Sequence, residues 1–130
     1  MNILVYTEES QTASKQLLEA LLKLDANVKL EIIGSYDSLV ERLQFPISGI
    51  EVVVIQASTR EELEALIPLK AKLMRLRIIL ILPDANPEIL SLGHQFCPRF
   101  LTSIDANFEH VEAVLQRMQN NYSETALQEH

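Results

Sequence analysis

The sequence predicts an α/β fold, in which a five-stranded parallel sheet is doubly wound and lies between two layers of helices. Three observations lead to this prediction. Five short apolar runs have the length of strands and occupy residues 3–6, 28–33, 52–55, 78–82 and 100–101. Amphipathic helical patterns lie between these runs. Parallel neighbours need right-handed helical crossovers, so this repeated alternation favours a sheet with the strand order 2-1-3-4-5.

The strand-like runs differ in their polarity. The runs at 52–55 and 78–82 are continuously apolar, as expected for strands that are covered on both faces. The run at 28–33 instead alternates through Lys29 and Glu31. We therefore expect this run to form an edge strand with one face more exposed to solvent.

The first two helical patterns follow the first two apolar runs. Leucines between residues 17 and 24 keep helical spacing after a polar start at residues 10–14, and residues 25–27 end this helix. The second helix is shorter. Ser38 and Glu41 have capping-box spacing, and Pro46 stops the helix.

The third helical pattern starts at Thr59 and Glu62, which again have capping-box spacing. Pro68 falls inside this pattern and predicts a kink or a division into two pieces. The fourth helix is short. It is expected to open at Asn86 and to end at Gly93.

The fifth helix begins near Asp105 and carries an apolar stripe that can cover one face of the sheet. This stripe consists of Phe108, Val111, Val114, Leu115 and Met118. After Asn120 the sequence is polar. We assign residues 1–120 to one domain and residues 121–130 to a polar tail or a frayed extension of the helix.

Composition narrows the classes of function. The chain has 130 residues, of which 18 are acidic and 11 basic, for a formal net charge of −7. This charge repels phosphates and argues against direct binding of nucleic acid or membranes. The basic group Lys70, Lys72, Arg75 and Arg77 is expected to be one solvated helix end. With a single Cys97, no charged leader and no apolar run near ~20 residues, we expect a cytoplasmic protein.

In a sheet of this order, functional groups gather at the carboxyl ends of the strands. The residues at these ends are, strand by strand, Thr7, Glu8 and Glu9, then Gln56, then Leu82 and Pro83, then Ser103 and Ile104. Across residues 2–120 the pattern resembles response-regulator receivers. That family has an acidic pair after the first strand and a phospho-accepting aspartate after the third. A hydroxyl residue follows its fourth strand, and a lysine and a proline follow its fifth.

The resemblance implies a pseudo-receiver, which is a receiver without its phosphorylation chemistry. Glu8 keeps one acid of the pair, and Gln56 takes the place of the aspartate. An amide cannot form an acyl phosphate and is a poor ligand for magnesium. Leu82 or Pro83 replaces the hydroxyl residue, and Ser103 replaces the lysine. We therefore expect neither a cofactor nor a metal nor an enzymatic activity.

The resemblance also implies an interaction surface. Receivers bind partners or form homodimers through the face of their fourth helix, fifth strand and fifth helix. Phe100 stands where receivers carry an aromatic residue that moves between exposed and buried positions, and a plain core phenylalanine is the alternative. We expect a protein partner or a second copy to bind a face that includes His94, Arg99, Phe100, Leu101, Glu109 and Glu112, with Leu92, Gln95 and Gln116 as further candidates.

Two alternatives compete with this interpretation. Thr7, Ser10 and Thr12 invite comparison with the phosphate loop of flavodoxins, but Glu8 and Glu9 would oppose a phosphate there. An enzyme of another kind would draw on a small set of titratable residues, yet a lone His and Cys make a poor zinc signal. We expect Cys97 to be a buried structural residue and His94 to lie on the surface near a helix end. The full set of candidates is Asp84, His94, Cys97, Asp105, Glu109 and His110.

Overall fold

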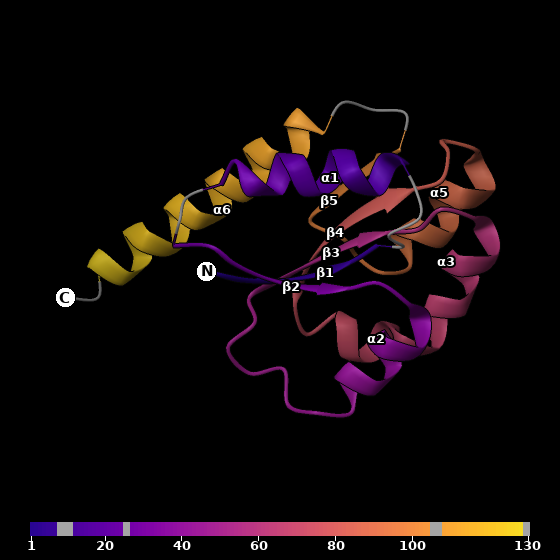
Figure 1. Cartoon of the computed structure of the whole chain (residues 1–130), viewed down its shortest axis with the longest axis horizontal. Coiled ribbons are helices and arrows are strands. Elements are labelled where there is room, and N and C mark those ends of the chain that lie inside the picture. The colour runs from indigo at the N-terminus through magenta and orange to yellow at the C-terminus, as the bar shows by residue number, and fades with distance from the viewer. Residues whose placement is uncertain (8–11, 25–26, 105–107, 129–130) are drawn as a thin grey trace.

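A computed structural model describes residues 1–7, 12–24, 27–104 and 108–128. Along the chain the elements are β1 (Asn2–Tyr6), α1 (Thr12–Leu22), β2 (Lys29–Ile33), α2 (Tyr36–Leu43), β3 (Val52–Gln56), α3 (Arg60–Leu66), the 3₁₀ helix η1 (Ile67–Leu69), α4 (Lys70–Leu73), β4 (Arg77–Leu82), α5 (Pro87–His94), β5 (Phe100–Ser103) and α6 (Glu109–Gln128). Strands and helices alternate as predicted (Figure 1). No helix in the described ranges is long and apolar enough to cross a membrane.

The five strands form one parallel sheet in the order β2-β1-β3-β4-β5. The predicted order is therefore confirmed. The central strand β3 is buried along its whole length, whereas β2 at one edge has an exposed and half-buried pattern. The prediction of an edge strand for residues 28–33 is also confirmed, because β2 pairs with β1 on one side only.

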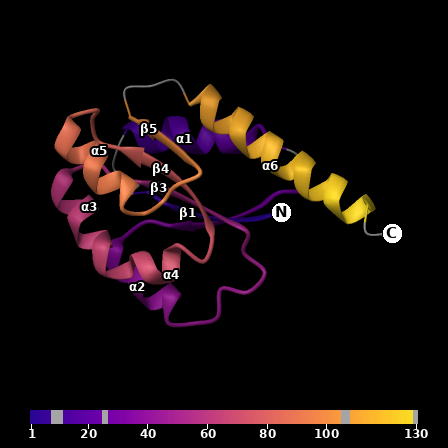
Figure 2. The same ribbon diagram turned by 180° about the vertical axis from the view of Figure 1, so that it is seen from behind.

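Helices cover both faces of the sheet and divide the core into two clusters (Figures 1 and 2). On one face, α1 and α6 pack on Ile3, Val5, Val54 and Ile79, so alternate residues of each strand point into this cluster. On the other face, α2, α3, α4 and α5 pack on the remaining strand residues, among them Leu80. Covering both faces explains why the central strands are continuously apolar.

The local signals at helix starts were correct for α3 and α5 but wrong for α2. Thr59 is the N-cap of α3 and accepts a hydrogen bond from the Glu62 N–H at 3.1 Å. Asn86 is the N-cap of α5. The N-cap of α2 is Ser35 rather than Ser38, whose N–H donates to the Ser35 hydroxyl at 3.2 Å. The helix therefore begins one turn earlier than its capping-box spacing suggested.

Helix ends show two further results. Pro68 divides the third helical pattern as predicted, since η1 separates α3 from α4. Gly93, the expected end of α5, instead lies inside the helix and is buried. A Cβ atom at Gly93 would lie 3.1 Å from Leu82 Cδ2 and 3.2 Å from Leu101 Cδ1, so glycine is needed there for close packing rather than for capping.

Two predictions of burial or placement were wrong. Cys97 is exposed, and its φ of 50° puts it in the left-handed region just after α5. The basic group does not form one helix end, because Lys70 and Lys72 belong to α4 whereas Arg77 is the first residue of β4. The last helix runs on to Gln128, so residues 121–128 continue α6.

Candidate functional site at the carboxyl ends of the strands

The sheet register brings four of the predicted site residues to one edge. Thr7 follows β1, and Gln56, Leu82 and Ser103 end β3, β4 and β5. Leu82 pairs with Ser103 across β4 and β5, and Gln56 pairs with Ile81. Parallel strands all end at the same side of a sheet, so these residues lie in a row along it. Glu8, Glu9 and Asp105 lie outside the described residues.

Thr7 and Gln56 form a buried polar pair in the middle of this edge. Both side chains are 0% exposed, and the Thr7 hydroxyl donates a hydrogen bond to Gln56 Oε1. The Thr7 N–H donates to the carbonyl of Ile33 at 3.1 Å, so its backbone donor is used within the sheet. The pair is uncharged. It offers a hydroxyl and an amide, and neither group can form an acyl phosphate, which requires a carboxylate.

The neighbouring strand ends are also without charge. Leu82 is buried and packs toward Gly93, and its carbonyl accepts a hydrogen bond from the Ile104 N–H at 2.9 Å. Pro83 and Ser103 are half-buried. The four strand-end residues Thr7, Gln56, Leu82 and Ser103 therefore provide two hydroxyl groups, one amide and one apolar side chain, and none of the four is charged.

Acidic groups beside this edge are engaged locally. Asp84 Oδ1 accepts a hydrogen bond from the Asn86 N–H at 2.8 Å, as in the Asx turns that precede helices. Glu62 Oε2 accepts from the Ser58 N–H at 2.9 Å. Within the part of the chain that the structure describes, His, Cys, Asp and Glu form no group of three that could hold a metal ion.

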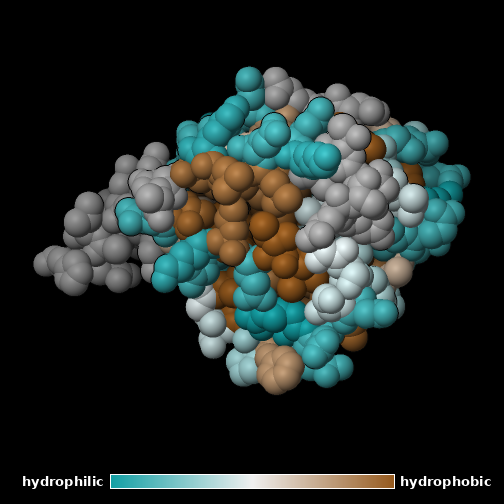
Figure 3. All heavy atoms as spheres, viewed as in Figure 1, coloured by the Kyte–Doolittle hydropathy of each residue, from teal (hydrophilic) through white to brown (hydrophobic). Residues whose placement is uncertain are grey.

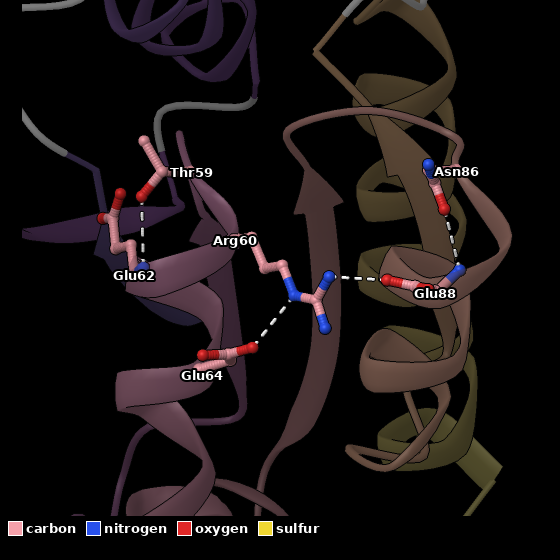
Figure 4. Close-up of polar contacts among 6 residues, drawn as sticks. All are labelled: Thr59, Arg60, Glu62, Glu64, Asn86 and Glu88. Carbon is pink, nitrogen blue, oxygen red and sulfur yellow. Dashed lines mark hydrogen bonds and ion pairs between the residues drawn. The ribbon is translucent and has the colours of Figure 1, made fainter.

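A charged network connects α3 and α5 next to this edge (Figure 4). Arg60 contacts Glu64 at 2.9 Å and Glu88 at 2.5 Å. Hydrogen bonds raise the pKa of Arg60 above its ordinary value, and the bond to Glu64 has a larger effect than the bond to Glu88. Sequence reasoning missed this network. The spacing of Arg60 and Glu64 could have revealed one half of it, whereas Glu88 lies 28 residues away.

The residues of the predicted interaction face lie in different parts of the structure. Phe100 is half-buried and packs on the cluster beneath α1 and α6, while Leu101 packs on the opposite cluster. His94 is exposed in the last turn of α5, as expected. Arg99 lines a hollow of about 380 Å³ at the amino ends of the strands, together with Arg75, Arg77 and Cys97.

Glu109 and Glu112 belong to another surface. They line a groove of about 300 Å³ between α1 and α6 with Glu19 and Lys23. The predicted face therefore contributes residues to at least two separate hollows. Among the candidates for catalysis, His94 and Cys97 are joined by a backbone hydrogen bond of 3.1 Å, and His110 is exposed on α6.

Comparison with known proteins supports the fold. No protein-family model and no curated protein matches the sequence. A response-regulator receiver protein from Pseudoalteromonas atlantica is similar, with a TM-score of 0.66, 16% identity, and coverage of 95% of this chain and 98% of that one. A candidate pilus assembly protein from Burkholderia thailandensis has a TM-score of 0.63 and 17% identity, covering 92% and 98%.

A third solved structure is a candidate pilus assembly-related protein from Burkholderia pseudomallei. It has a TM-score of 0.62 and 20% identity, and the match covers 90% of this chain and 87% of that one. At such low sequence identities, the matches support a shared backbone fold but not a shared functional site. The chain has the receiver-like α/β fold that these solved structures share.

Proposed function

We propose that the chain is a pseudo-receiver, a regulatory domain that acts through protein–protein interaction and accepts no phosphoryl group. One observation carries the proposal. Gln56 is the last residue of β3, the position where the resemblance to receivers predicts the phospho-accepting aspartate. Its amide is buried and accepts a hydrogen bond from the Thr7 hydroxyl. A receiver needs a carboxylate there, because the acyl phosphate forms on a carboxylate oxygen.

The surroundings of Gln56 support the same proposal. Magnesium binding depends on several charged oxygen ligands. Thr7 and Gln56 are neutral, and Ser103 cannot replace a lysine as the cationic partner of a phosphoryl group. Without a phosphoryl group to shift populations, a partner would bind one constant conformation of the domain.

Phosphoryl transfer can be tested directly. The purified protein is incubated with magnesium and a small phosphoryl donor, and its intact mass is measured beside that of an active receiver. We expect an adduct on the active receiver and none on this chain. A stable gain of one phosphoryl group by this chain, retained in a Ser103→Ala control, would overturn the proposal.

A second experiment can identify the class of protein that binds this chain. Two of the similar structures are described as candidate pilus assembly proteins, and one as a response-regulator receiver. Affinity capture from the native cell, followed by identification of the bound proteins, separates these settings. Components of a surface-assembly machine would favour the first, and a sensor kinase or transcription factor would favour the second.

The flavodoxin-like alternative is opposed by Thr7. Its hydroxyl donates to Gln56 and its N–H donates to Ile33, so these two donors are already used within the protein. Phosphate loops instead direct such donors at the ligand. Absorbance of the purified protein should be blank in the flavin bands, and a yellow preparation would favour flavin binding.

A further inference from the structure

The edge strand β2 lies beside an exposed apolar area. Leu22 is 74% exposed and Ile32 is 44% exposed, and Leu18, Val28 and Leu30 are half-buried. We call these five residues the β2 patch. Figure 3 shows a hydrophobic area on this face of the molecule, where α1 and β2 lie in Figure 1. Contiguous exposed apolar surface of this kind marks interaction sites.

The backbone of β2 can accept a further strand. The Lys29 N–H donates to the Met1 carbonyl, and the Ile33 carbonyl accepts from the Thr7 N–H, so both residues direct their peptide groups toward β1. Peptide groups alternate in direction along a strand. The N–H and C=O groups of Leu30 and Ile32 therefore point away from the sheet, to the side where the described residues place no strand next to β2.

The charges on β2 are self-complementary. Suppose that a second β2 strand runs antiparallel and places Leu30 opposite the Leu30 of the second copy. Each Lys29 then lies opposite a Glu31, twice by symmetry, and each Ile32 lies opposite a Val28. Leu30 and Ile32 form the hydrogen-bonded pairs, whereas Lys29 and Glu31 form the closer pairs between them. Opposite charges in directly facing positions are favourable.

The neighbouring registers lack this match. A shift that preserves the backbone bonding moves the pairing by two residues. One such shift places Lys29 opposite Lys29, and the other places Glu31 opposite Glu31. Like charges in directly facing positions are destabilising. The charges on this strand therefore favour one register of self-pairing.

Arg42 of α2 supports this arrangement. It contacts Glu31 at 2.5 Å, and the Glu31 side chain is still 46% exposed. The carboxylate is therefore held over β2 while one side remains open to a second cation. On the other face of the sheet, symmetry would bring the two copies of the β2 patch together, including Leu22 of each α1.

We propose that β2 pairs with the β2 of a second copy of this chain, in antiparallel orientation and with Leu30 at the two-fold axis. The result is a single sheet that continues through both protomers, with the β2 patch covered by its own copy. This surface differs from the face of α5, β5 and α6. The proposal does not rest on the proposed function, because its observations concern β2, α1 and Arg42 and not Gln56.

Charge reversal with mixing tests the register. Sedimentation equilibrium on the full chain should show a weak dimer, with a dissociation constant on the order of 10 µM. Lys29→Glu and Glu31→Lys should each weaken the dimer by at least about tenfold, since each makes both charge pairs repulsive. An equimolar mixture of the two variants should dimerise again, because every facing pair is then opposite in charge.

A backbone variant and two controls complete the experiment. Ile32→Pro removes an N–H that points away from the sheet, so the fold should persist by circular dichroism while the dimer is lost. Arg99→Glu and Glu61→Lys change the net charge by the same amounts as the β2 variants but lie elsewhere, and should leave the dimer intact. A monomer at several hundred micromolar, or a mixture that fails to dimerise, would overturn the proposal.

Discussion

Strands β2 and β3 have equal length and share one partner, yet they differ in almost every other respect. Both pair with β1 in parallel, so that Val5 lies between Ile32 and Val54. All five residues of β3 are buried, whereas none of the five residues of β2 is. Position in the sheet, rather than strand length or pairing partner, therefore determines how deeply a strand is buried in this fold.

The physical cause is the number of covered sides. β3 has a strand on each side and helices on both faces, so its peptide groups and side chains are removed from water. β2 has one neighbouring strand and keeps charged residues within its span. Edge strands with open backbone groups invite pairing with other chains. We therefore expect changes in β3 to affect folding and changes in β2 to affect association.

The largest expected difference is between Ile55→Ala and Ile32→Ala. Ile55 is 0% exposed within the core, so truncation should cost about 2–5 kcal/mol of the free energy of unfolding. Ile32 is 44% exposed and should cost less than about 1 kcal/mol. Urea unfolding at low protein concentration measures both. Similar costs for the two variants would mean that burial does not separate β3 from β2 in stability.

The buried pair at the end of β3 should behave as a unit. Gln56→Leu removes the acceptor of the Thr7 hydroxyl, and Thr7→Val removes the donor. Each single change should cost about 1–3 kcal/mol of the free energy of unfolding, because the remaining group stays buried. The double variant should cost less than the sum of the two. Strict additivity in urea unfolding would mean that the pair is not coupled.

The opposite edge of the sheet is packed differently from β2. β5 is also an edge strand, but α5 packs closely over its junction with β4 at Gly93. Gly93→Val should overpack Leu82 and Leu101 and cost about 1–3 kcal/mol of the free energy of unfolding. Ser91→Val, at an exposed position of the same helix, is the matched control. Equal thermal stability of the two variants would contradict close packing at Gly93.

The pattern of apolar and polar residues in the sequence was sufficient to predict the architecture of the fold. Continuous apolar runs, an alternating run at residues 28–33 and Pro68 correctly predicted the sheet order, the edge strand and the divided helix. These features depend on the local pattern of burial and on backbone geometry, which neighbouring residues determine. The cap of α2 was misplaced because Ser35 and Ser38 both suit a helix start, and the choice depends on which hydroxyl the backbone reaches.

Sequence patterns could not predict contacts between segments that are far apart in the chain. Thr7 and Gln56 are 49 residues apart, and Arg60 and Glu88 are 28 apart, so their meeting depends on register and helix packing. The exposure of Cys97 likewise depends on how the chain leaves α5, with a φ of 50°. The sequence predicted that Gln56 stands at the end of a strand. It could not predict that a hydroxyl lies against the amide.

The smallest expected effect concerns the salt bridge on β2. Arg42→Met keeps the apolar stem of the side chain but removes the partner of Glu31, which is 46% exposed. Partly exposed ion pairs contribute about 0.2–1 kcal/mol to the free energy of unfolding, and salt screens them. Urea unfolding in low salt should therefore detect a small loss that shrinks in high salt. A loss that persists unchanged in high salt would mean that Arg42 stabilises α2 through packing or its 3.2 Å hydrogen bond to the Pro46 carbonyl rather than through charge.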